Sequence, residues 1–242
     1  MGSFFNAIVY QPLYNLLVFV YNIIPGQDFG IAIIITTILL RAILVPIYKK
    51  QIESQQKLQE LQPKIKAIQE KNKNNKEGQA KEMMELYKTH KTNPFSGCLP
   101  LVIQFIFLIA IYRILINISS SNLAIDASQL YTFIKNPGNV NHLFISIVDL
   151  TKPSVVIAIL AAIAQFFQTK MLMQKQAKEA PKTESTDQKP DFAQMMSKQM
   201  LYLGPFLTFF IGIKFAAGLS LYWLASTLFM LIQQVYMQRK KN

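Results

Sequence analysis

The stretch that decides the fold is Phe29-Gly-Ile-Ala-Ile-Ile-Ile-Thr-Thr-Ile-Leu-Leu-Arg-Ala-Ile-Leu-Val-Pro-Ile-Tyr48. A helix of about 20 apolar residues is long enough to cross a bilayer. The only charged residue of this run is Arg41, and a guanidinium near mid-span is costly unless water or polar partners surround it. Because no Asp or Glu lies in any apolar run of the chain, we expect Arg41 to face a wet cavity within the membrane.

Several such runs occur along the 242 residues, of which 51% are hydrophobic. This composition predicts a helical membrane protein with about five spans and one cytoplasmic excursion. The net charge of +12 is unevenly placed: residues 49–91 hold eleven Lys and six acidic residues, whereas residues 117–153 hold two Lys and two Asp. By the positive-inside rule, we expect the basic loops and the C-terminus in the cytoplasm, and the N-terminus and loop 118–153 outside.

The predicted division of the chain follows from these runs and charges. The segments are an outer interfacial amphipathic helix (1–27), span 1 (28–48), a cytoplasmic helical hairpin (49–92), span 2 (93–118), an extracytoplasmic segment (119–153), span 3 (154–173), a cytoplasmic loop (174–198), span 4 (199–214), span 5 (215–237) and a short basic tail (238–242). The first segment is long enough to span instead, but Gln11, Asn15 and Asn22 share one face of its helical wheel, which favours a surface helix. The hairpin is either a solvated element without a partner or a contact for anionic lipid, protein or ribosomal RNA.

Motifs for covalent or metal chemistry are missing from the sequence. Both histidines, His90 and His142, lie outside the spans, and no His-Glu-x-x-His or Gly-x-x-x-x-Gly-Lys motif occurs. Ser220 and Ser226 lie in spans without a predicted His or Lys partner, so they are interpreted as packing residues. We therefore expect no enzyme, no cofactor and no metal site.

Six stretches together resemble the YidC family of membrane protein insertases, which includes mitochondrial and chloroplast relatives. They are Ile35-Thr-Thr-Ile-Leu-Leu-Arg41 with Pro46, Leu61-Gln-Pro-Lys64, Met84-Glu-Leu-Tyr-Lys88, Asn93-Pro-Phe-Ser-Gly-Cys-Leu-Pro-Leu-Val-Ile-Gln104, Gln165-Phe-Phe-Gln-Thr-Lys-Met171, and Ala217-Gly-Leu-Ser-Leu-Tyr-Trp223 with Gln233-Gln234. The resemblance implies an all-α polytopic membrane protein, in which five transmembrane helices surround a hydrophilic groove and a cytoplasmic helical hairpin joins the first two.

The resemblance also implies which residues line the groove. The family's groove arginine corresponds to Arg41, and a groove hydroxyl one turn earlier corresponds to Thr37. The remaining predicted groove residues are Gln104 of the second span, Gln165 of the third, and Tyr222 and Trp223 of the last. The long basic tail of some relatives has no counterpart in Gln238-Arg-Lys-Lys-Asn242, so we expect any ribosome docking to involve residues 51–91.

The expected function is that of an insertase and chaperone in the bacterial inner membrane. It would draw short hydrophilic tails of nascent membrane proteins into a positively charged, lipid-open groove and release their apolar segments into the bilayer. The Sec translocon and the ribosome are candidate partners, and no specific nucleic-acid sequence is expected to bind. The alternatives are an assembly scaffold for other membrane proteins and an anion channel or carrier.

The predicted groove residues also have purely structural interpretations. Arg41 is then a structural cation bonded to span carbonyls, and Thr37 bonds its own helix. Gln104 and Gln165 join helices by hydrogen bonds, while Tyr222 and Trp223 are core or interface aromatics.

Overall fold

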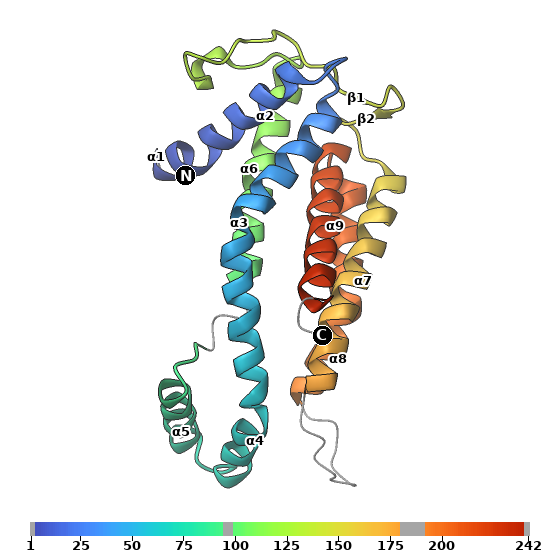
Figure 1. Ribbon diagram of the computed structural model, residues 1–242. Coiled ribbons are helices and arrows are strands. Elements are labelled where there is room, and N and C mark those ends of the chain that lie inside the picture. The colour runs from blue at the N-terminus through green and yellow to red at the C-terminus, as the bar shows by residue number, and fades with distance from the viewer. Residues whose placement is uncertain (1–2, 94–98, 180–191, 240–242) are drawn as a thin grey trace.

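The computed structural model describes residues 3–93, 99–179 and 192–239. Its helices are α1 (Ser3–Phe5), the π-helical turn η1 (Asn6–Tyr10), α2 (Gln11–Ile23), α3 (Phe29–Glu60), α4 (Gln62–Lys71), α5 (Lys76–Thr89), α6 (Leu99–Ser120), the short 3₁₀ helix η3 (Ala127–Gln129), α7 (Val155–Glu179), α8 (Phe192–Lys214) and α9 (Ala217–Arg239). Two short strands, β1 (Leu143–Phe144) and β2 (Val148–Asp149), form an antiparallel hairpin. The long helices run alongside one another, with α4 and α5 at one end and the segment between α6 and α7 at the other (Figure 1).

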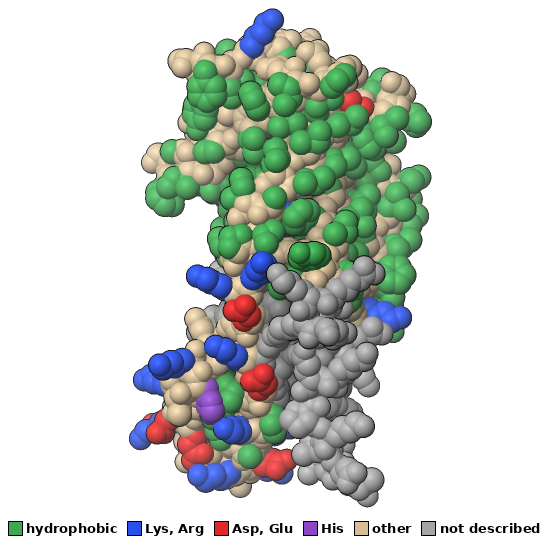
Figure 2. All heavy atoms as spheres, in the orientation of Figure 1, with side chains coloured by type: hydrophobic (Ala, Val, Ile, Leu, Met, Phe, Trp, Pro, Cys, Tyr) green, Lys and Arg blue, Asp and Glu red, His purple; other side chains and the backbone are tan. Residues whose placement is uncertain are grey.

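Five helical stretches are long and apolar enough to cross a membrane: Ser3–Ile23, Phe29–Gln51, Val102–Ser120, Val155–Leu172 and Ala217–Met237. Hydrophobic side chains cover the upper part of the molecule, whereas charged side chains gather over the α4–α5 end (Figure 2). The protein is therefore an all-α polytopic membrane protein. These five stretches include the N-terminal one, which we assign to the membrane surface. They leave out the shorter apolar part of α8, Leu201–Lys214, which we count as span 4. Both assignments stay predictions.

Helix α3 extends well past the predicted end of span 1. It runs unbroken through Pro46 to Glu60, so the first residues expected in the hairpin belong to the same helix as Arg41. Its 32 residues correspond to about 48 Å, against a hydrocarbon core of about 30 Å. The hairpin proper consists of α4, which has Pro63 in its first turn, and α5, whose N-cap Asn75 accepts a hydrogen bond from Gly78 N at 2.9 Å. Because of this cap, α5 begins at Lys76, with residues 72–75 between it and the end of α4.

The polar face of α2 binds the main chain of the segment between α6 and α7. Asn15 Nδ2 donates to Gln129 O at 2.8 Å, and Asn15 Oδ1 accepts from Tyr131 N at 2.7 Å. Gln11 donates to the same Gln129 carbonyl, and Asn22 Nδ2 donates to Lys135 O. Other side chains of α2 pack into the core, where Leu17 and Val18 are fully buried. Of the polar stripe that predicted a surface helix, Asn15 is thus buried by protein, whereas Gln11 and Asn22 are half-buried.

The β1–β2 hairpin lies at the end of the bundle that is remote from α4 and α5 (Figure 1). Its tip holds Ile145 and Ser146 at positive φ, and Asp28 Oδ2 accepts from Ile145 N at 2.6 Å. At its second strand, burial opposes ionisation of Asp149, but hydrogen bonds from Thr151 and an ion pair with Lys152 prevail and lower the pKa of Asp149 to about 2. The segment after β2 holds the start of α9, because Ala217 N donates to the carbonyl of Lys152 and Gly218 N to that of Leu150.

Helices α7, α8 and α9 pack closely at this end. Only Phe215 and Ala216 separate α8 from α9, so the turn between these two helices is tight. Gly212 of α8 lies so near α7 that an added Cβ would stand 2.6 Å from Ala158 Cβ. The predicted loop over 174–198 is corrected: α7 continues to Glu179 and α8 begins at Phe192, because the polar residues flanking the spans are compatible with helix. The rest of that loop, 180–191, lies outside the described residues.

Candidate functional site: the Arg41 cluster

Arg41 lies where α3, α6 and α9 meet. Its Nε donates to Ser226 Oγ at 2.9 Å, and its Nη2 donates to both Ser226 Oγ and Gln104 Oε1. Nη1 donates to the hydroxyl of Tyr48, whose ring centre lies 5.2 Å from the guanidinium carbon. We call Arg41, Tyr48, Gln104 and Ser226 the Arg41 cluster.

The helical repeat brings this cluster together. Tyr48 follows Arg41 by seven residues, or about two turns, so both side chains lie on one face of α3. This register survives because α3 remains helical through Pro46. Gln104 and Ser226 come from α6 and α9, so the cluster connects three helices that are far apart in sequence.

The guanidinium is enclosed rather than open to solvent. Arg41 is 4% exposed and Tyr48 6%, and Ser226 is fully buried. We expected Arg41 to face a wet cavity, but in this structure hydroxyl and amide oxygens of the cluster surround it instead. Its hydrogen bonds go to side chains, not to span carbonyls as the structural interpretation proposed.

The Arg41 cluster holds positive charge without a matching negative charge. Each acceptor that the described residues offer to Arg41 is a neutral oxygen. In addition, the Gln104 Nε2 group is buried and finds no hydrogen-bond partner among the described residues. The guanidinium bonds to these oxygens are already charge-assisted, but a carboxylate would add the attraction between opposite charges, which is stronger in a low-dielectric interior than in water. The cluster is therefore suited to exchange its neutral acceptors for an anionic group.

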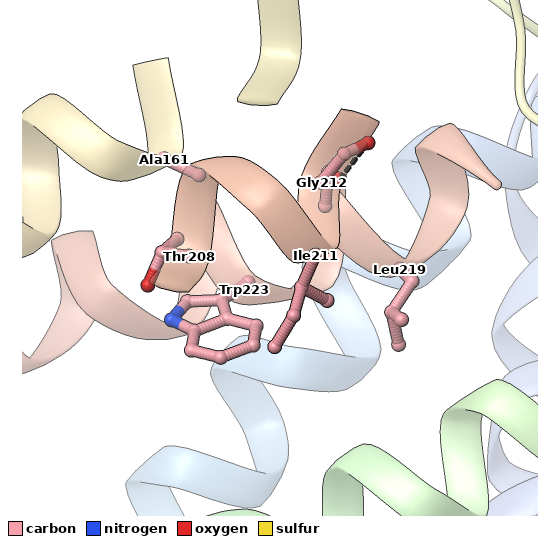
Figure 3. A pocket seen from close by; sticks show the side chains of 7 residues that line it. Ala161, Thr208, Ile211, Gly212, Leu219 and Trp223 are labelled. Carbon is pink, nitrogen blue, oxygen red and sulfur yellow. Dashed lines mark hydrogen bonds between the residues drawn. The ribbon is translucent and has the colours of Figure 1, made fainter. Parts of the chain in front are cut away.

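A second polar group joins α7 and α9. The indole Nε1 of Trp223 donates to Gln165 Oε1 at 3.3 Å, and Thr227 Oγ1 donates to the same oxygen at 3.4 Å. Trp223 also borders a crevice between α7, α8 and α9, beside Thr208 and Ile211 (Figure 3). Gln165 therefore joins two helices, as the structural interpretation proposed, and holds the indole in one orientation.

The six predicted groove residues thus do not form one continuous polar group. Arg41 and Gln104 share one cluster, and Gln165 and Trp223 share the other. Thr37 belongs to neither, because its hydroxyl donates to Ile33 O of its own helix at 2.6 Å. Tyr222 is buried at 2% exposure, one turn before Ser226 on α9.

Sequence reasoning missed Tyr48 and Ser226. We interpreted Ser226 as a packing residue, whereas it accepts two hydrogen bonds from Arg41. The spacing between Arg41 and Tyr48 could have indicated that they share a helix face. No comparable sequence signal identifies Ser226, because its contact depends on how α9 is rotated against α3.

Comparison with known proteins identifies the family of the chain. The family model described as "60Kd inner membrane protein" matches residues 19–242. A Fusobacterium nucleatum protein named "Membrane protein insertase YidC" is 32% identical over 236 residues, covering 97% of this chain and 98% of the relative. Proteins of the same name from Streptomyces avermitilis and Campylobacter jejuni are 30% and 34% identical over 91% and 94% of this chain.

These relatives differ in length. The chain spans 53% of the Streptomyces protein and 37% of the Campylobacter protein, in contrast to nearly all of the Fusobacterium protein. The family match covers the Arg41 cluster, the Gln165–Trp223 pair and the α4–α5 hairpin. This chain belongs to the 60Kd inner membrane protein family, the family of the YidC membrane protein insertases.

Proposed function

We propose that this protein is a membrane protein insertase whose Arg41 cluster receives the hydrophilic tail of a client. The observation that carries the proposal is the buried Arg41 guanidinium, which is held by neutral oxygens of three helices and meets no carboxylate among residues 3–93, 99–179 and 192–239. The relatives named as insertases supply the reaction class.

The proposed mechanism needs no covalent step. An acidic group of the client tail displaces the neutral acceptors around Arg41, because the attraction between opposite charges in a low-dielectric interior adds to the hydrogen bonds that the guanidinium donates. This attraction offsets part of the cost of dehydrating the tail. The apolar segment that follows then moves sideways into lipid, which is favourable for a long uncharged helix.

The proposed orientation places the N-terminus and the outer hairpin outside and the C-terminus in the cytoplasm. The α4–α5 hairpin, with its many lysines, then lies at the cytoplasmic surface, where the ribosome and the Sec translocon are candidate partners. Nascent membrane proteins are the proposed clients, and Thr37, Gln165, Tyr222 and Trp223 are proposed to border their path.

The test replaces Arg41 in cells depleted of their own insertase. We expect Arg41→Ala to slow insertion of clients with acidic tails by about tenfold, which corresponds to about 1.4 kcal/mol. Arg41→Lys keeps the charge but loses the planar fork of donors, so we expect intermediate activity. The matched control is Arg113→Ala on α6. It also removes an arginine from a predicted span, but Arg113 packs against the Phe5 ring and is not part of the Arg41 cluster. Full activity of Arg41→Ala, with normal protein levels, would disprove the proposal.

A further inference from the structure

Two buried glutamines lie along the same pair of helices as Arg41 but outside its cluster. Gln51 of α3 is 4% exposed, and both its Nε2 and Oε1 atoms lack a hydrogen-bond partner among the described residues. Gln234 of α9 is 7% exposed, and its Nε2 is likewise without a partner. Buried side-chain amides in proteins are nearly always hydrogen-bonded, so these three unpaired atoms on packed helices require an explanation.

Both glutamines lie between the Arg41 cluster and the end of the molecule that carries the α4–α5 hairpin. Helices α3 and α9 pack against each other and are joined by the bonds between Arg41 and Ser226. Gln51 follows Arg41 by ten residues and Gln234 follows Ser226 by eight, which are rises of about 15 Å and 12 Å along the two helices. Since both helices run from the outer hairpin toward the α4 end (Figure 1), the two amides lie at a similar depth.

The chemistry of these amides differs from that of Arg41. A glutamine side chain offers one acceptor and two donors and carries no charge. Peptide N–H and C=O groups, and the hydroxyl and amide groups of Ser, Thr, Asn and Gln, are complementary to it. An unpaired amide pair therefore fits an extended, uncharged polar segment, whereas the guanidinium of Arg41 favours an anionic one.

We propose that Gln51 and Gln234 form a second client-binding site that hydrogen-bonds the main chain and uncharged polar side chains of a client tail before the tail reaches Arg41. This inference rests on the proposed insertase function and extends it to clients whose tails carry no acidic residue. A client in this site supplies partners for Nε2 and Oε1 of Gln51 and for Nε2 of Gln234.

The test compares two clients that differ only in the tail, one with acidic residues and one with Ser, Thr, Asn and Gln at the same positions. We expect the double variant Gln51→Leu/Gln234→Leu to lower insertion of the uncharged tail at least about threefold more than insertion of the acidic tail. Arg41→Ala should show the opposite preference. The conservative pair Gln51→Asn/Gln234→Asn keeps both amides and should retain more activity than the leucine pair.

Gln233→Leu supplies the matched control. Gln233 is adjacent to Gln234, but it is partly exposed and donates to Met237 Sδ on its own helix. We expect Gln233→Leu to leave the insertion of both clients unchanged. Equal effects of the leucine pair and Gln233→Leu, or equal effects of the leucine pair on both clients, would overturn the inference.

A second measurement covers the case in which the leucine pair does not accumulate. A photoreactive amino acid at position 51 should crosslink to the uncharged tail of a stalled nascent chain. If no crosslink to that tail forms, the inference is overturned. The outcomes also separate the two proposals. If Arg41→Ala inserts the acidic tail normally while the glutamine pair still impairs the uncharged tail, the role of Arg41 fails and the glutamine site stands.

Discussion

The neutral surroundings of Arg41 make it different from a residue in a buried ion pair. A carboxylate in the fold would occupy the guanidinium permanently, and removing it would leave an uncompensated buried charge. Tyr48, Gln104 and Ser226 instead supply acceptors that hold Arg41 in place but compete weakly with an anion. Such a cluster can bind and release an acidic group without breaking an ion pair of its own.

Tyr48→Phe tests this exchange. The change removes the hydroxyl acceptor of Arg41 Nη1 and keeps the aromatic ring beside the guanidinium. Losing a hydrogen bond of this kind should cost the empty protein about 1–3 kcal/mol, because one charged N–H is left unpaired. The client carboxylate then meets less competition. We therefore expect a lower melting temperature in detergent but a crosslink yield from acidic tails that is at least about twofold higher.

The control for this variant is Tyr236→Phe, which changes an exposed tyrosine of α9. It should alter neither the melting temperature nor the crosslink yield. A lower yield with Tyr48→Phe would show that the Tyr48 hydroxyl helps to bind clients rather than competing with them.

At the level of the elements, the sequence predicts which segments are helical better than where the helices end. The apolar run ending at Tyr48 predicts a membrane crossing, yet α3 continues through Lys49 to Glu60. Hydropathy falls at the membrane surface, whereas Gln, Lys and Glu favour helix on both sides of it. Arg41 can be identified from sequence because a charge within a span is rare, but its partners depend on the rotation of α6 and α9, which no local pattern determines.

The contact between α7 and α8 gives an element-scale prediction. Small residues let membrane helices approach closely, and a Cβ on Gly212 would stand 2.6 Å from Ala158 Cβ and 3.1 Å from Ser220 Oγ. We expect Gly212→Ala to destabilise the protein by about 1–3 kcal/mol through overpacking, seen as a lower melting temperature in detergent.

Two variants show whether this contact is the cause. Ala158→Gly removes the opposing methyl group, so the double variant should recover most of the lost stability. Gly204→Ala on the same helix is the control, because its Cβ would meet Gln165 Nε2 only at 4.0 Å. A double variant no more stable than Gly212→Ala alone would contradict the packing explanation.

For the molecule as a whole, the placement of α2 decides which helices cross the membrane. Gln11 near its start and Asn22 near its end both bind the segment between α6 and α7. These residues are eleven positions apart, or about 16 Å along the helix. If α2 crossed the bilayer, this polar segment, which includes Gln129 and Lys135, would have to follow it into lipid. The contacts therefore favour α2 at the outer surface and α8 as the fourth span.

Single cysteines test this arrangement together with the orientation of the chain. In a Cys98→Ser background, we place one cysteine each at the exposed positions Ser3, Lys73 and Lys135 and treat intact spheroplasts with a membrane-impermeant maleimide. Lys135→Cys should label from outside and Lys73→Cys only after lysis, because the positive-inside rule keeps the basic hairpin in the cytoplasm. A surface α2 leaves Ser3→Cys open to the outside reagent, whereas a spanning Ser3–Ile23 helix would carry it to the cytoplasmic side, since Phe29 begins α3 at the outer end. Labelling of Ser3→Cys only after lysis would therefore show that the Ser3–Ile23 helix crosses the membrane and that the N-terminus lies in the cytoplasm.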